Sequence, residues 1–361
     1  MADPMVVAVF GPPPDGMNLA DDQSTANAVV AVVCAVIATV SLVLRLWAKM
    51  SQRASVTADD ALIFIALIFV YGTCALTIMG GHYGSGKHLW ANNLPDVSMV
   101  FKLLYAYTYV YAGSVSFTKL GILLFYRRIF QRGSKSFFYR LYFAAFMCTG
   151  YPLAIWFTMA GICNPVSQFW TQFIGTQGTC VDVNAAFLTM TVINMVNDII
   201  VLVVPIPEIL QLQMSFKKKI GVCGIMLLGS FVCVVSCVRI WAFVKFIHTT
   251  DLTWATSSVF LWSSIEPAAG ILSACLPNMR PLFRRAKDKI TSASKSHGDT
   301  SNSGNWARSK NDVRSYVRFG DDQSSSHEDE VALTKISKGQ GSLHTTPENV
   351  IVVRSEIKQT S

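Results

Sequence analysis

The chain has 361 residues, of which 52% are hydrophobic and 14% charged, and its formal net charge is +8. Because soluble globular domains have roughly a quarter of their residues charged, this composition excludes an ordinary soluble protein. The apolar residues also occur in blocks of about 20, the length that a helix needs to cross the hydrocarbon core of a bilayer. The sequence therefore predicts an all-α integral membrane protein.

Residues 1–26 precede the first apolar block and are acidic and proline-rich, so we predict a flexible tail there. They have no basic start followed by an apolar stretch, so no cleavable signal peptide is predicted. The sequence then predicts seven membrane-spanning helices, at about 27–48, 60–79, 103–125, 138–162, 183–205, 220–244 and 254–276. The third is rich in Tyr and Ser, which favours a place inside the bundle. The seventh is expected to end near Leu276, because Pro277 and Pro281 follow.

Lys and Arg residues in the connections set the orientation of such a bundle. With the N-terminus outside, the outer segments hold three of them, Lys87, Lys102 and Lys245. The inner segments then hold fourteen: Lys49, Arg53, Arg127, Arg128, Arg132, Lys135, Lys217, Lys218, Lys219, Arg280, Arg284, Arg285, Lys287 and Lys289. We therefore predict an outer N-terminus and a cytosolic C-terminus. The positive charge faces anionic lipid or an acidic cytosolic protein, and no nucleic acid is expected.

The composition changes near residue 290 to a polar, serine-rich sequence, which cannot bury enough apolar surface to fold alone. Three regions are therefore predicted: an outer flexible tail (1–26), a seven-helix membrane domain (27–285) and a disordered cytosolic tail (286–361). Near its end, NVIVVRSEI alternates β-branched residues. Either this segment adds a strand to a partner's sheet, or it is a loose apolar patch.

Two of the nine cysteines bracket an outer loop, CNPVSQFWTQFIGTQGTC, and the other seven lie in apolar spans. Because the outer compartment is oxidising, a disulfide bond between Cys163 and Cys180 is predicted. The other seven are expected to be small buried apolar side chains. No Cys/His spacing of a metal site occurs in the sequence, so neither a metal nor a cofactor is predicted.

Ionisable side chains inside a bilayer are costly unless they are paired or hydrated, so they are candidates for function. Lys119 and Asp198 both have a predicted depth of about 10 Å above the inner boundary, and we expect them to form an ion pair. Arg45, near the inner end of the first helix, is expected to meet Asp59 or Asp60 at the start of the second.

Glu266 lies near the midplane of the last helix, and Arg239 lies on the sixth helix at a smaller predicted depth. Two alternatives are open. Glu266 lines a polar pocket open to the outer face, or it is protonated or hydrogen-bonded to a neighbouring helix and fixes packing. Asn194 and Asn197 lie on the same helix as Asp198, either as part of its polar face or bonded to adjacent helices. The outer loop GGHYGSGKH offers His82 as a further candidate, with a structural turn and a ligand contact both open.

Several motifs occur in order along the chain. After Arg45 and Trp47 come ADDAL (58–62), GGHYGSGKH (80–88), KLGILLFYRRIF (119–130), CNP with a following Trp and Cys, VPIP (204–207), Arg239 and WSSIEPAAGILSACLPNMRP (262–281). In this order and spacing the chain resembles the fungal rhodopsin-domain integral membrane proteins, which are related to the fungal PTH-type receptor-like proteins. The resemblance covers about 27–285. It implies a receptor-like protein or a membrane protein of a biosynthetic gene cluster.

A retinal protein needs a Schiff-base lysine, which here would stand on the last helix, and residues 254–276 contain none. The DRY and NPxxY signatures of ordinary G-protein-coupled receptors are absent as well, so coupling to a G protein is not predicted.

Our main hypothesis is a sensor of a small lipophilic or amphipathic ligand that acts on a cytosolic protein through the basic inner loops and the tail. The first alternative is a membrane enzyme or accessory factor of a fungal secondary-metabolite pathway, with Glu266 or Asp198 as proton donor. The second is a transporter, which the lack of internal repeats disfavours. Both the plasma membrane and an internal membrane fit the sequence.

Overall fold

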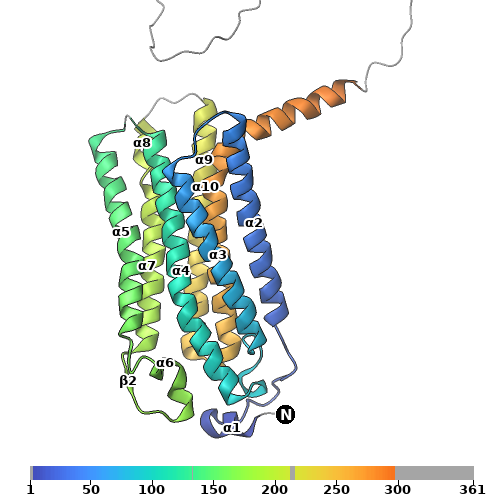
Figure 1. The fold of residues 1–361 in the computed structure, drawn as a ribbon, viewed down its shortest axis with the longest axis vertical. Helices are drawn as coiled ribbons and strands as arrows, with labels where there is room; N and C mark the ends of the chain where they lie inside the picture. The colour runs from blue at the N-terminus through green and yellow to red at the C-terminus, as the bar shows by residue number, and fades with distance from the viewer. Residues whose placement is uncertain (1–2, 132, 212–215, 297–361) are drawn as a thin grey trace, which may run out of the picture. The chain divides into compact units, whose positions relative to one another are not determined.

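The computed structural model describes residues 3–131, 133–211 and 216–296, and it describes only the backbone at 211, 216–228, 278 and 280–296. This part is an all-α structure in which long helices run side by side (Figure 1). Two short strands, β1 (Cys163–Asn164) and β2 (Thr179–Cys180), pair antiparallel within one loop. Helices α1 (Pro4–Phe10) and α6 (Gln168–Thr171) lie at one end of the bundle, and α8 (Ile206–Gln211) lies at the other (Figure 1).

In the described part of the chain, each of the seven predicted ranges falls on a long helix. These are α2 (Ser24–Ser51), α3 (Ala58–His82), α4 (Leu94–Ile129), α5 (Lys135–Ala160), α7 (Val183–Val203), α9 (Phe216–His248) and α10 (Leu252–Ser296). Six of them, all except α4, contain a segment that is long and apolar enough to cross a membrane.

Helix α4 lies largely inside the bundle, as does the Leu252–Pro277 part of α10. Helix α4 contacts α3, α5, α7 and α10. Its buried residues include several that lower its hydropathy, among them Tyr107, Tyr111, Ser114, Ser116 and Lys119. The interior place that the sequence predicted for this helix is therefore confirmed.

Local sequence signals set where several helices begin. Thr57 and Asp60 form a capping box at the start of α3. Ser134 caps α5 by accepting a hydrogen bond from the backbone N–H of Phe137, and Asp182 caps α7 in the same way. These side chains satisfy backbone donors that the first helical turn leaves without partners.

The last helix does not end near Leu276, so that prediction was wrong. Helix α10 continues through Pro277 and Pro281 to Ser296. Each proline removes one backbone donor and crowds the preceding turn, which bends a helix without always ending it. The C-terminal part of α10 extends beyond the end of the bundle (Figure 1).

The N-terminal segment, predicted as flexible, contains a short helix that packs at the end of the bundle where α6 lies (Figure 1). In α1, Val6 is fully buried. The backbone N–H of Asp3 donates to the Trp90 carbonyl at 3.2 Å, and the Trp90 indole N–H donates to the Gly11 carbonyl at 2.7 Å. Trp90 belongs to η1 (Leu89–Ala91), a short 3-10 helix before α4. The predicted cytosolic tail lies mostly at 297–361, outside the described residues.

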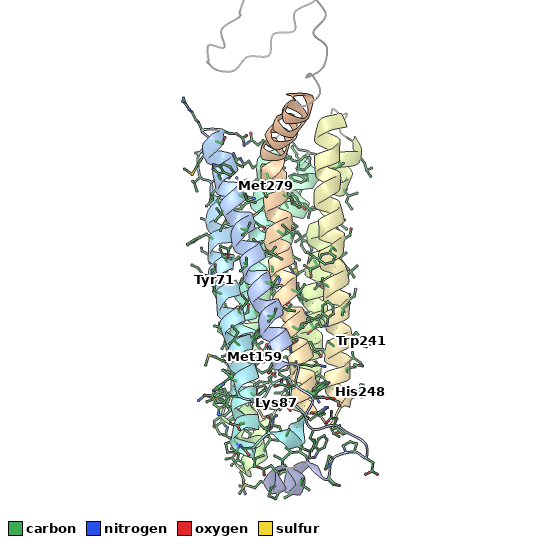
Figure 2. The ribbon with its side chains drawn as sticks, turned by 90° about the vertical axis from the view of Figure 1, so that its right-hand side faces the viewer. Tyr71, Lys87, Met159, Trp241, His248 and Met279 are labelled. Atoms are coloured by element: carbon green, nitrogen blue, oxygen red, sulfur yellow. A yellow bond between two sulfur atoms is a disulfide. The ribbon has the colours of Figure 1, made fainter. Side chains whose placement is uncertain are left out.

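Apolar side chains cover much of the outward surface of the bundle as well as its core. Helix α2 exposes Val29, Val33, Val36 and Val40, each by about half of its side-chain area. A soluble protein rarely presents such a continuous apolar face to water, whereas a lipid bilayer solvates it. Figure 2 shows Lys87 and Met279 at opposite ends of the bundle, so that this apolar surface lies between them.

Candidate functional site

Five polar side chains from four helices meet inside the bundle, and we call them the central polar network. Each is at most 6% exposed to solvent. Helix α4 contributes Lys119, α7 contributes Asn194 and Asp198, α9 contributes Arg239, and α10 contributes Glu266. Because an isolated buried charge is strongly unfavourable, their mutual contacts are what keep these groups in an apolar interior.

Lys119 and Asp198, which have similar predicted depths, are in direct contact. The Lys119 ammonium lies 3.0 Å from Asp198 Oδ1 and donates to Asn194 Oδ1 at 2.8 Å. Asp198 Oδ2 in turn accepts a hydrogen bond from the Ser236 hydroxyl at 2.7 Å. This half of the network is therefore a hydrogen-bonded ion pair between α4 and α7, tied to α9 by Ser236.

Glu266 and Arg239 also meet, although their predicted depths differ. Arg239 Nε lies 3.2 Å from Glu266 Oε2. Helix α9 ends at His248, four residues beyond the predicted end, so Arg239 lies about 14 Å along the helix from its C-terminal end instead of about 8 Å. The long arginine side chain spans the remaining difference.

Glu266 receives its hydrogen bonds from other helices. The Tyr111 hydroxyl donates to Glu266 Oε2 at 2.7 Å, and the Asn194 side-chain amide donates to Oε1. The Arg239 guanidinium stacks over the Tyr111 ring, 4.5 Å from its centroid. These contacts agree with the alternative in which Glu266 is hydrogen-bonded to neighbouring helices.

Some donors in this region have no acceptor. Arg239 Nε and Nη2 and the Asn197 side-chain Nδ2 are buried and form no hydrogen bond with any group among the described residues. The distance from Arg239 Nε to Glu266 suits an ion pair, but the two groups are not aligned for a hydrogen bond. Because a buried donor without an acceptor costs free energy, this part of the network is incompletely satisfied.

Two small cavities flank the network. One, of about 50 Å³, is lined by Lys119, Asp198 and Glu266 and extends toward Pro277. The other, of about 30 Å³, is lined by Arg239 and by apolar and aromatic residues such as Tyr107. Each has room for one or a few water molecules but not for a larger ligand. Glu266 therefore faces the cavity that extends toward Pro277, and Arg239 faces the one lined by Tyr107.

A second buried cluster, the inner-end cluster, joins α2, α3 and α10. Arg45 is fully buried and pairs with both Asp59 and Asp60, and it donates to the Ala274 carbonyl at 2.5 Å. Lys49 also pairs with Asp60. The sequence suggested one acid as the partner of Arg45 and did not suggest Lys49, although Lys49 lies one helical turn after Arg45.

His82 lies apart from both clusters. It is exposed, and its ring contacts the edge of the Tyr83 ring. A neighbouring pair was missed: the His88 Nδ1 atom lies 2.5 Å from Asp251 Oδ2, and the His88 ring stacks on Trp254 at 4.3 Å. Asp251 directly precedes α10 and so occupies the N-cap position of that helix. An aspartate at a helix start was the one sequence signal that could have pointed to this residue.

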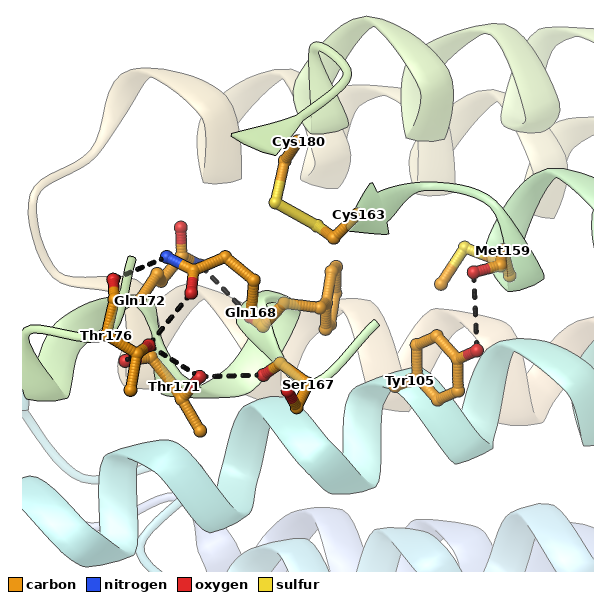
Figure 3. The surroundings of a disulfide bond; sticks show 10 residues. Tyr105, Met159, Cys163, Ser167, Gln168, Thr171, Gln172, Thr176 and Cys180 are labelled. Carbon is orange, nitrogen blue, oxygen red and sulfur yellow. Dashed lines mark hydrogen bonds between the residues drawn. A yellow bond between two sulfur atoms is a disulfide. The ribbon is translucent and has the colours of Figure 1, made fainter. Parts of the chain in front are cut away.

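The loop between α5 and α7 contains the predicted disulfide bond. Cys163 and Cys180 are bonded and are partners in the β1–β2 pair, so the prediction is confirmed. The segment between the two cysteines contains α6 and η2 (Gln172–Ile174). The Gln168 side chain, on α6, is hydrogen-bonded to Thr176, which follows η2, and these bonds hold the segment together (Figure 3). The bond therefore closes a compact cap beside the C-terminal end of α5 and the N-terminal end of α7.

Residues 44–285 match the family described as the fungal rhodopsin domain. A SAT4 family membrane protein of Emericella nidulans is 30% identical over 63% of this chain and 58% of its own length. Fugralins biosynthesis cluster protein 2 of Gibberella zeae is 26% identical over 74% of this chain and 68% of its length. Receptor GIN3 of Arthrobotrys oligospora is 22% identical over 72% of this chain and 62% of its length.

The aligned part of this chain thus spans between 58% and 68% of the length of these three relatives. No solved structure matches the chain. The matched range, 44–285, includes both buried clusters and the outer disulfide loop. Together with the apolar helices, this match shows that the chain is a multi-pass membrane protein that belongs to the fungal rhodopsin domain family.

Proposed function

We propose that this protein is a receptor-like sensor of a small molecule, with seven membrane-spanning helices, an outer N-terminus and a cytosolic C-terminus. Helix α4 has 36 residues and is about 54 Å long, more than the thickness of a bilayer core. Its polar residues face other helices, so low hydropathy does not exclude a membrane span. The excess of Lys and Arg in the segments assigned to the cytosol supports the orientation.

The observation that carries this proposal is the incomplete satisfaction of Arg239. Its charge is paired with Glu266, yet two of its nitrogen atoms have no acceptor. A ligand group or water that accepts from Arg239 would compete with Glu266 and favour a second arrangement of α9 and α10. A ligand shifts a protein between two arrangements only if it binds one of them more tightly, and an unsatisfied donor provides such a difference.

Helix α10 is a direct route from the network to the inner end. Ala274 lies about two turns after Glu266 on this helix, and its carbonyl accepts a hydrogen bond from Arg45. A shift of α10 at Glu266 therefore alters the contact that holds α10 to α2. We propose that a cytosolic partner detects this change through the basic inner loops.

The ligand is not expected to be retinal, since residues 254–276 contain no lysine for a Schiff base. The cavity beside Arg239 has a volume of only about 30 Å³, so a small amphipathic molecule that reaches the bundle from outside would bind only the second arrangement, in which α9 and α10 lie farther apart.

The proposal can be tested in the native host with alleles of the full-length gene. First, transcripts that respond to a culture-medium extract in the wild type but not in a deletion strain are identified. Glu266→Gln and Arg239→Gln are expected to lose this response. Glu208→Gln, which alters an acid paired with Arg140 at the inner end, is the matched control and is expected to retain it. Full responses in both network variants, at wild-type protein levels in the membrane, would refute the proposal.

A second candidate is an accessory factor of a secondary-metabolite pathway. It is favoured because several relatives are named after such gene clusters, including Satratoxin biosynthesis SC1 cluster protein 4 of Stachybotrys chartarum. The two candidates differ in a deletion strain. Loss of a sensor lowers pathway transcripts without accumulation of an intermediate, whereas loss of an accessory factor leaves transcripts unchanged and an intermediate accumulates. Conversion of that intermediate by purified protein would indicate an enzyme, and its retention inside the cell a transporter.

A further inference from the structure

A groove of about 480 Å³ lies between the outer halves of α9 and α10 and belongs to neither buried cluster. Helix α9 lines it with Trp241, Lys245 and His248, and α10 lines it with Trp254, Ser258 and Trp262. Residues three, four or eight positions apart share a face of a helix, so each set forms one wall. Figure 2 shows Trp241 and His248 on the same edge of the bundle.

The groove has basic residues but no acidic ones. Lys245 is exposed, and its ammonium lies 4.4 Å from the centroid of the Trp241 ring. Within the residues that the structure describes, neither Lys245 nor His248 forms an ion pair, and no carboxylate lines the groove. The groove is therefore complementary to an anionic group at its outer end.

Three tryptophans give the rest of the groove an apolar lining. An aromatic belt at the membrane surface is the ordinary role of exposed Trp residues. Trp262, however, lies about 15 Å along α10 from Leu252, its first residue, and a belt residue is expected near the end of a helix. Tryptophans of an aromatic belt also need not line a concave surface. This groove is concave, and its volume is in the range of sites that bind drug-sized molecules.

We propose that this groove binds one single-chain lipophilic carboxylate. Its carboxylate lies beside Lys245 and His248, and its apolar chain runs inward along Trp241 and Trp262. A neutral lipid leaves the ammonium without a counter-charge, and the volume does not hold both chains of a phospholipid.

This site adjoins the helices that carry the central ion pair. Trp241 lies two residues after Arg239, and Trp262 lies one turn before Glu266. A bound chain therefore contacts the two helices whose relative position the ion pair controls. Any role in sensing rests on the function proposed above, whereas binding itself does not.

Binding can be measured with the full-length protein in nanodiscs of phosphatidylcholine. The probe is a brominated fatty acid, which quenches tryptophan fluorescence on contact, and the brominated alcohol of the same length is its neutral match. We expect saturable quenching by the acid, with about fivefold weaker affinity in Lys245→Gln. Lys102→Gln is the matched control, since Lys102 also lies at the outer end and contacts a tryptophan, 5.9 Å from the Trp170 centroid.

A second variant fills the groove and leaves its charges in place. Ser258→Phe is expected to abolish saturable quenching by the acid. The proposal is overturned if the acid and the alcohol quench alike, or if Lys245→Gln and Lys102→Gln lower the affinity equally, because either result indicates partition into the bilayer. If Lys245→Gln weakens binding but leaves the transcript response intact, the site stands and its link to sensing is rejected.

Discussion

The inner-end cluster and the central polar network both bury an arginine among carboxylates, but they differ in how well that arginine is satisfied. Arg45 pairs with two aspartates and donates to a backbone carbonyl of α10. Arg239 pairs with one glutamate, and two of its nitrogen atoms have no acceptor. A satisfied buried network holds one arrangement, whereas a partly satisfied one gains free energy by taking a new partner. The comparison therefore favours a structural role for the inner-end cluster and supports the responsive role that we propose for the central polar network.

The largest effect is expected at the inner-end cluster. Arg45→Met leaves Asp59 and Asp60 with Lys49 and, 4.0 Å from Asp59, the part-exposed Arg128 as their cationic partners among the described residues, and should lower the free energy of unfolding by about 3–5 kcal/mol. Thermal unfolding of the purified protein in detergent measures this change. Arg140→Met is the control, because the Arg140 side chain is 30% exposed and lies 3.4 Å from Glu208, a pair worth about 0–1 kcal/mol. Equal losses in the two variants would contradict the role assigned to Arg45.

The ion pair between α4 and α7 is expected to give the next largest effect. Lys119→Met should cost about 2–3 kcal/mol, because Asp198 then keeps neutral hydrogen-bond donors but loses its cation. Adding Asp198→Asn removes the uncompensated charge, so the double variant should be more stable than the sum of the single effects predicts. A double-mutant cycle checks this point, and additive losses would show that the two groups are not coupled.

A smaller loss is expected at Arg239, and this result sharpens the comparison most directly. Arg239→Met should cost about 1–2 kcal/mol, since Glu266 keeps its hydrogen bonds from Tyr111 and Asn194. The measurement is the same unfolding experiment as for Arg45→Met. A loss as large as that of Arg45→Met would mean that the two clusters do not differ as we describe.

The smallest effect is expected for the hydrogen bond from Tyr111 to Glu266. Tyr111→Phe keeps the ring under the Arg239 guanidinium and removes only the hydroxyl, so the cost should be about 1 kcal/mol. Tyr139→Phe is the matched control, because Tyr139 is 78% exposed and should show no measurable change. If both variants unfold at the same temperature, the bond to Glu266 does not contribute to stability.

Contacts between residues of similar depth could be predicted from the sequence. Lys119 and Asp198 have similar predicted depths on their helices and opposite charges, and Arg45 precedes two aspartates across one short connection. The pairing of Arg239 with Glu266 was harder to predict, because it depends on where α9 ends, and the hydropathy pattern does not mark that end. His88 and Asp251 were missed because a loop and a helix start, distant in sequence, meet only in the fold.

The sequence by itself determined that the chain is a helical membrane protein, where its long helices lie, and that Cys163 and Cys180 are bonded. These properties follow from local composition and from the compartment that a loop occupies. Only the tertiary structure decided which polar groups are satisfied and that α10 continues past its prolines. Hydrogen-bond satisfaction depends on the rotation, tilt and spacing of several helices at once, and a one-dimensional hydropathy pattern contains none of these quantities.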